Sequence, residues 1–231
     1  MKRLVRAAAS LGLSAAVLVG AVGFAHTPAG RPMLRALGRV VHGGCPLGYD
    51  RALTPADRER AAHVFARNHH GDRTAPQRPA LGFALDKTTR AEIIATMAKQ
   101  GVACSAARGA ADLTCTNVPS ETLAGASLTP PTRNLWFTFG AKQQLLSLVS
   151  ISRAPAAAPI SDAFLAAERT ISEQAGAPTQ THGGTAPEAL AAGLLSQESA
   201  EFRFANYYAL ARASNLGESY LLTEEYRSLR D

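Results

Sequence analysis

The feature that most constrains the fold of this chain is a pair of neighbouring segments in which apolar and polar residues alternate. Residues 135–139 read LWFTF, and a short turn that begins with glycine separates them from LLSLVSI at residues 145–151. In the second segment Leu145, Val149 and Ile151 are expected to lie on one face. Alternation with a period of two is typical of strands that bury one face, so we predict an antiparallel hairpin over these residues.

A helix is predicted upstream of this hairpin. Thr89 and Glu92 have the spacing of a capping box, in which the two side chains satisfy backbone N–H groups of the first turn. Gly101 follows the last apolar residue of the helical pattern, where a glycine commonly ends a helix. Before the helix, the alternation in residues 81–85 (LGFAL) predicts a short strand.

The chain has three cysteines, and two of them are predicted to form a disulfide. Cys104 and Cys115 are placed symmetrically about a turn between two segments with strand character, 102–105 and 113–116. Facing residues of a two-stranded hairpin can meet the distance limits of a disulfide. The alternative is a pair of buried free thiols. Cys45 is left over, and it could act as a reactive thiol, as an intermolecular partner or as an alternative partner for either of the others.

The order of a helix followed by antiparallel strands occurs a second time in the last part of the chain. The alanine- and proline-rich residues 154–159 predict a linker, and Ser161 is expected to cap a helix that ends at Gly176. A further short helix and three strands are then predicted at residues 185–195, 202–204, 208–210 and 220–226. We therefore predict an α+β fold with helices packed on an antiparallel sheet, in two tandem units at 80–153 and 161–231.

An N-terminal export segment is predicted over residues 1–25. The basic stretch MKRLVR precedes an uncharged and largely apolar run from Ala7 to Ala25. This run fits either a signal peptide with cleavage after Ala25 or a membrane anchor over residues 7–25, and both readings stay open. We expect an exported protein, periplasmic or extracellular, which is anchored in the inner membrane if the segment is not cleaved.

The region between the export segment and the first unit, residues 26–79, is basic and contains one predicted helix. That helix is expected to start at Thr54–Pro55 and to continue to about Arg67. Residues 31–80 carry nine arginines against four acids, whereas the residues from 81 onward carry 12 Lys and Arg against 14 Asp and Glu. The basic excess therefore lies outside the two predicted units, and we expect no nucleic-acid partner.

No sequence motif assigns a catalytic residue, a cofactor or a metal site. His63 and His70 could share a helix face, but no HExxH or CxxC pattern accompanies them. Glu224 and Glu225 are adjacent in a predicted strand and are expected to point to opposite faces, which is unsuitable for a catalytic pair. The tyrosines of the last strands predict either a binding face or cross-strand packing; they are Tyr207, Tyr208, Tyr220 and Tyr226.

The doubled element order, the export segment and the sequence LGFALDKTTRAEI at residues 81–93 resemble small bacterial envelope modules. The similar proteins are α/β units of the outer-membrane-assembly lipoprotein and β-lactamase-inhibitor-protein type, and the resemblance covers about residues 80–228. The chain departs from the lipoprotein pattern, because no cysteine directly follows the apolar segment. The resemblance implies a non-enzymatic binding or scaffold role with a protein partner in the envelope. The alternatives are a hydrolase or thiol-dependent enzyme, and a protein that binds a metal or a small ligand.

Overall fold

The computed structural model describes residues 55–107, 112–184 and 186–229 of the chain. The predicted export segment and Cys45 lie outside these residues, as does the predicted helix cap at Thr54. The described residues contain four α-helices, one short 3-10 helix and one antiparallel sheet, so the predicted α+β class is confirmed.

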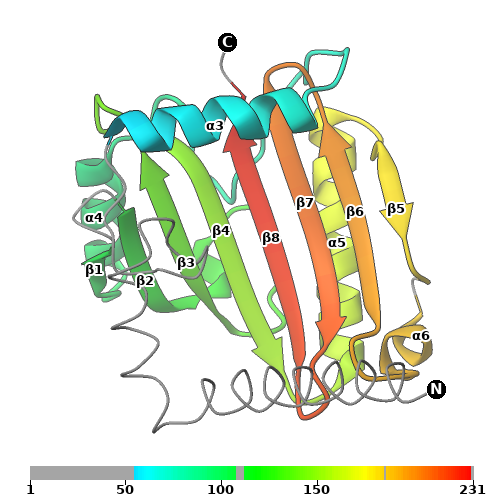
Figure 1. Cartoon of the computed structure of the whole chain (residues 1–231). Helices are drawn as coiled ribbons and strands as arrows, with labels where there is room; N and C mark the ends of the chain where they lie inside the picture. Colours follow the sequence, from blue (N-terminus) through cyan, green and yellow to red (C-terminus); the bar gives the residue numbers. More distant parts are fainter. Residues whose placement is uncertain (1–54, 108–111, 185, 230–231) are drawn as a thin grey trace, which may run out of the picture. The chain divides into compact units, whose positions relative to one another are not determined.

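The eight strands of the described residues form a single antiparallel sheet (Figure 1). Their bounds are β1 Cys104–Ala107, β2 Asp112–Pro119, β3 Thr132–Phe139, β4 Leu145–Ala154, β5 Gln180–His182, β6 Gln197–Arg203, β7 Tyr207–Asn215 and β8 Tyr220–Ser228. In the sheet they follow the order β1-β2-β3-β4-β8-β7-β6-β5. The first four strands and the last four therefore extend outward from a shared centre, where β4 pairs with β8.

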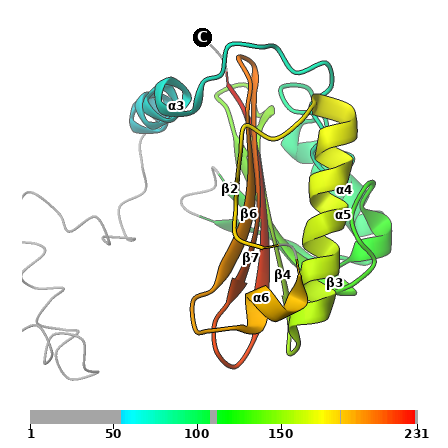
Figure 2. The ribbon, with the colours of Figure 1, turned by 90° about the vertical axis from the view of Figure 1, so that its right-hand side faces the viewer.

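The helices are distributed unequally over the two faces of the sheet (Figure 2). On one face lie α4 (Arg90–Lys99), α5 (Ala157–Ala175) and α6 (Pro187–Ala191), whereas α3 (Pro55–His69) lies on the opposite side. The 3-10 helix Ser120–Thr122 follows β2. Because α4 precedes the first four strands and α5 precedes the last four, the chain runs twice through a helix followed by four strands.

The main core lies between the sheet and the helices α4 and α5. Leu135 and Phe137 of β3 are completely buried in it, whereas Trp136 between them is exposed on the other face. The pairing of β3 with β4 confirms the predicted hairpin. From α5, Ile160 and Phe164 enter the same core, and burial of each such side chain stabilises the fold by roughly 1.5–3 kcal/mol.

Three local predictions about the first helix and hairpin are confirmed. Thr89 and Glu92 form the capping box of α4, with each side chain bonded to the other residue's backbone N–H. Gly101 follows α4 with a φ of 71°, a conformation that glycine adopts without a steric cost. Cys104 and Cys115 are directly opposite each other on β1 and β2 and form a disulfide.

The predicted strand at residues 81–85 is wrong. This segment consists of turns, in which Leu81 has a φ of 54° and the N–H of Phe83 bonds the carbonyl of Ala80 at 3.0 Å. The alternating side chains Leu81 and Leu85 are nevertheless buried. They cover one end of the core from a segment without regular secondary structure. The alternation of apolar residues therefore reflects burial and not a strand.

The predicted linker at residues 154–159 and the predicted cap at Ser161 are also wrong. β4 extends to Ala154, and α5 begins at Ala157 with Ala156 as the residue before its first turn. Ser161 therefore lies inside the helix, where it is buried and its hydroxyl faces the carboxylate of Glu198 at 3.5 Å. Its hydroxyl thus lies within hydrogen-bond distance of a side chain of β6.

The prediction that Leu145 shares a face with Val149 and Ile151 fails because β4 contains an irregularity. Thr138 pairs with Ser147, but the next residue of β3 pairs with Leu145, so the register shifts by one residue. Each extra residue in a strand moves the following side chains to the opposite face. Leu145 is consequently buried in the core, whereas Val149 and Ile151 lie on the other face of the sheet.

Candidate functional site: the open face of the sheet

The face of the sheet opposite α4, α5 and α6 is the candidate functional site, and we call it the open face. In the part of the chain that the structure describes, α3 is the only helix on this side, and it crosses the ends of the strands (Figure 1). Most of the length of the strands therefore lies beyond α3. Antiparallel sheets often leave one face to solvent, and such a face normally carries polar side chains.

Side chains of the open face form rows that run across the sheet. One row crosses all eight strands: Ser105, Thr114, Trp136, Val149, Glu225, Leu210, Glu201 and Gln180. The next row contains Asn134, Ile151, Thr223, Arg212, Ser199 and His182. A third, shorter row contains Arg153, Leu221, Ser214 and Gln197. The continuous registers fix these side chains as direct neighbours.

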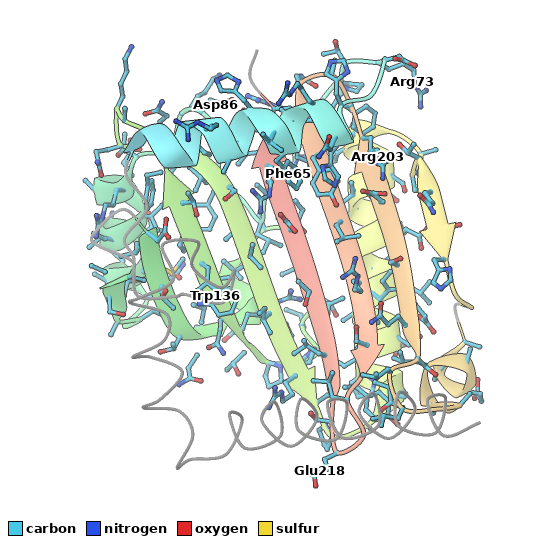
Figure 3. All side chains as sticks on the ribbon, in the orientation of Figure 1. Phe65, Arg73, Asp86, Trp136, Arg203 and Glu218 are labelled. Atoms are coloured by element: carbon cyan, nitrogen blue, oxygen red, sulfur yellow. A yellow bond between two sulfur atoms is a disulfide. The ribbon has the colours of Figure 1, made fainter. Side chains whose placement is uncertain are left out.

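Apolar residues are concentrated in the middle of this otherwise polar face. We call the set formed by Trp136, Val149, Ile151 and Leu221 the apolar strip. Trp136 is 46% exposed and lies directly opposite Val149 (Figure 3). A large aromatic side chain in the centre of a sheet would ordinarily be buried, because burial of its area stabilises the fold. Its position among polar neighbours is typical of contact surfaces for other proteins.

Two acidic residues near the strip are paired with arginines on their own strands. Glu225 pairs with Arg227, and Glu201 pairs with Arg203 at 2.7 Å. Burial raises the pKa of the Tyr208 phenol far above its usual range, and the carboxylates of Glu201 and Glu225 raise it further. The phenol is therefore neutral. Because both carboxylates are paired with arginines, the part of the open face next to α3 has little net charge.

Arg153 and Arg212 provide the charge at the other end of the open face. Both are exposed, and no carboxylate among the described residues forms an ion pair with either of them. Arg212 is opposite Thr223, and Arg153 is opposite Leu221. The two guanidinium groups thus flank β8, and the strand spacing and rise put their Cα atoms about 12 Å apart.

A small aromatic cluster attaches α3 to the open face. The ring of Phe65 stacks on His69 with centroids 4.0 Å apart, and it meets Tyr208 edge to face at 5.0 Å. The guanidinium of Arg227 lies 4.2 Å from the centre of the Phe65 ring. Tyr208, Leu210 and Leu229 form the buried part of this second apolar cluster, separate from the main core. The attachment of α3 therefore depends on few side chains.

The tyrosines named in the sequence analysis are divided between the two faces. Tyr207 and Tyr226 are buried in the main core, where burial raises the pKa of each phenol well above its usual range. Tyr208 belongs to the cluster under α3, and Tyr220 is half-buried against the core. They do not form one binding face, because neighbouring strand residues alternate between the two sides.

The predicted histidine grouping is not a compact site. His63 and His70 are exposed on or just after α3, whereas His69 packs on Phe65 and contacts the carbonyl of Phe65 at 2.9 Å. Among the described residues, no three His, Cys, Asp or Glu side chains lie close enough together to hold a metal ion. The disulfide pair Cys104 and Cys115 lies at the edge of the sheet, with Cys115 completely buried.

One buried polar group was not anticipated from the sequence. Arg133 of β3 bonds the carboxylate of Glu224 of β8 inside the core, with Ser150 of β4 in contact with both. Glu224 points into the core and Glu225 to the open face, as predicted from their adjacency. A signal was present, because Arg133 is in phase with the apolar residues Leu135 and Phe137.

None of the described helices has the length and apolar character needed to cross a lipid bilayer. Comparison with known proteins finds no matching family model, no matching curated protein and no similar solved structure. The resemblance to envelope modules inferred from the element order therefore stays a prediction.

Proposed function

We propose that this protein is a non-enzymatic binding module that contacts a protein partner through the open face of its sheet. The observation that carries the proposal is the exposed indole of Trp136 beside Val149 and Ile151, in the middle of a regular strand. Tryptophan and arginine are the residues most often responsible for binding energy at protein interfaces. Here the indole and the exposed arginines Arg153 and Arg212 occupy one surface.

The organisation of the sheet supports this proposal. Each strand of the open face is held by hydrogen-bonded neighbours and by a core on its other side, so its side chains are presented on a rigid support. A preorganised surface loses less conformational entropy when it binds. An eight-stranded face is also large enough for a standard contact, which buries about 800 Å² on each partner.

We further propose that the protein is exported and works in the envelope, either free or anchored by residues 7–25. The apolar segment of the sequence motivates this location. The disulfide between Cys104 and Cys115 is compatible with an oxidising compartment. A fusion of residues 1–30 to a reporter that is active only after export tests the proposal. Reporter activity is the expected result, and an inactive reporter retained in the cytoplasm would contradict it.

Co-purification from cross-linked cells of the natural host tests the binding function. We expect the full chain to retain a specific partner that the double variant Trp136→Ala/Val149→Ser loses. The matched control is Leu165→Ala, because Leu165 is 38% exposed on α5, on the opposite face of the sheet. Equal recovery of every partner by the wild type and the double variant would refute binding through the open face.

A further inference from the structure

Three exposed leucines gather at the end of the sheet opposite α3. Leu194 and Leu195 lie between α6 and β6 and are 71% and 65% exposed, and Leu216 of the β7–β8 turn is 40% exposed. The two connections touch, because a Cβ atom added to Gly217 would lie 3.2 Å from Leu194. We call these three residues the leucine tip. Contiguous exposed apolar side chains indicate a contact surface more often than isolated ones do.

Asn215 holds the two connections of the leucine tip together. Its backbone carbonyl accepts from the N–H of Leu195 at 2.9 Å, and its own N–H donates to the carbonyl of Ser196 at 2.9 Å. Its side chain donates to the carbonyl of Leu190 at 3.2 Å and accepts from the N–H of Gly217 at 2.8 Å. Since Asn215 is itself buried, the leucines are presented by a fixed support.

The backbone conformation of Leu195 is a second, independent indication that its side chain serves a contact. Its φ is 65°, in the left-handed region that favours glycine. A residue with a Cβ atom loses stability in this conformation. An exposed leucine here gains little from burial within its own chain, so both its conformation and its exposure cost free energy. Strained residues of this kind are concentrated at contact and switch sites.

The charges at this end of the molecule indicate what the leucine tip contacts. The exposed charged residues of α6 and of the β7–β8 turn are acidic, Glu188 and Glu218, and residues 187–197 and 214–219 contain no Lys or Arg. Figure 3 shows Glu218 projecting beyond the ends of the strands. The same end of the open face carries Arg153 beside Leu221. One end of the molecule thus combines an acidic leucine tip with a basic, partly apolar surface.

We propose that two copies of this chain form a symmetric dimer through this end. The leucine tip of each protomer packs on Ile151 and Leu221 of the other, and Glu218 approaches Arg153 of the other protomer. A twofold axis allows this because both surfaces lie at the same end of the protomer, so each contact occurs twice. An anionic membrane is a less suitable binding partner for the leucine tip, since the acidic residues beside the leucines would repel the lipid headgroups. The proposed contact shares Ile151 and Arg153 with the binding surface proposed above, whereas Trp136 lies outside it, so loss of the dimer and loss of a partner through Trp136 are distinguishable.

Sedimentation velocity of the full chain over a wide range of concentration tests the dimer. We expect the wild type to pass from monomer to dimer, and Leu194→Ser/Leu195→Ser to weaken the dimer about tenfold or more, a change of about 1.4 kcal/mol. Leu165→Ser on the opposite face is the matched control and should dimerise like the wild type. Unchanged circular dichroism melting curves show that each variant is folded.

A charge exchange makes the test specific for the proposed contact. Glu218→Arg and Arg153→Glu should each weaken the dimer, and the two changes together should restore it. A wild type that stays monomeric at every concentration overturns the proposal, as does a leucine double variant that dimerises normally. Binding of monomeric wild type to phosphatidylcholine vesicles, lost in the leucine variant, would assign the leucine tip to a lipid surface and also overturn it.

Discussion

Arg133 of β3 and Glu224 of β8 form an ion pair in the core, although β4 lies between their strands. Both side chains are buried, and Ser150 of β4 bonds the guanidinium at 3.3 Å and the carboxylate at 3.2 Å. Arg133 also donates to the hydroxyl of Ser120 and to the carbonyl of Ser127. The pair therefore connects the first set of strands to the second at the centre of the sheet.

Removal of one partner of this ion pair is expected to destabilise the protein strongly. Arg133→Met or Glu224→Gln leaves the other group buried without its partner, and such changes cost about 3–5 kcal/mol. Urea denaturation of each variant measures the free energy of unfolding. The double variant Arg133→Met/Glu224→Gln should be more stable than the sum of the single effects predicts, because it leaves no buried charge.

The partly exposed ion pair between Arg203 and Glu201 provides the control for that prediction. Since solvent screens such pairs, Arg203→Ala should cost less than about 1 kcal/mol. Strictly additive effects of the Arg133 and Glu224 changes would contradict the coupling that the structure shows.

The disulfide between Cys104 and Cys115 is expected to stabilise the edge of the sheet. It joins residues separated by 11 positions. Closing a loop of this length lowers the conformational entropy of the unfolded chain, which stabilises the folded state by about 3 kcal/mol. The variant Cys104→Ser/Cys115→Ser should lose that amount in urea denaturation. Reduction with dithiothreitol should destabilise the wild type to a similar extent and leave the variant unchanged; equal sensitivity of both proteins would contradict the prediction.

Glu198 makes the stability depend on pH. Burial raises the pKa of this carboxyl in the folded state, and the hydrogen bond from Ser161 opposes the shift only in part. The unfolded chain releases the proton near pH 4.3, so stability falls as the pH rises from there through the folded pKa. The substitution Glu198→Gln removes the ionisable carboxyl group and therefore this loss of stability at higher pH.

Urea denaturation at a series of pH values measures the difference between Glu198→Gln and the wild type. The stability of the variant relative to the wild type should increase from acidic to neutral pH and then stay constant. Glu188→Gln, the same substitution at an exposed position of α6, is the matched control. A relative stability that is independent of pH would exclude the burial effect.

The aromatic cluster predicts that α3 can be loosened without unfolding the sheet. Phe65→Ala removes the stacking on His69 and the contacts with Tyr208 and Arg227. We expect hydrogen exchange to increase in α3 while the amides of β4 and β8 stay protected, because the main core is separate from this cluster. Val64→Ala, at an exposed position of the same helix, should leave exchange unchanged. Faster exchange throughout the sheet would show that α3 is part of the main cooperative unit.

The local features of the fold could be predicted because their signals are local. The capping box of Thr89 and Glu92 and the facing cysteines Cys104 and Cys115 depend on residues close in sequence. By contrast, Arg133 and Glu224 are separated by 91 positions, and their contact requires β8 to insert beside β4. No short-range pattern specifies that strand order.

The open face was less accessible to prediction for a related reason. The shift of register between Leu145 and Ser147 places Val149 and Ile151 beside Trp136 on this face, whereas regular alternation from Leu145 would have placed them in the core. The cysteine hairpin and the β3–β4 hairpin were predicted as structural elements, and the surface that they help to form emerges only because β4 pairs with β8 and β8 with β7. Side-chain alternation identifies two faces but does not show which one a helix covers.

Site-specific photo-cross-linking in the natural host tests the central claim most directly. A photoreactive amino acid replaces Trp136 on the open face in one variant and Leu165 on α5 in another, both exposed in the structure. The binding function predicts a discrete cross-linked protein from position 136 that is absent from position 165. The same products from both positions, or none from position 136 in a folded and correctly localised protein, would contradict it.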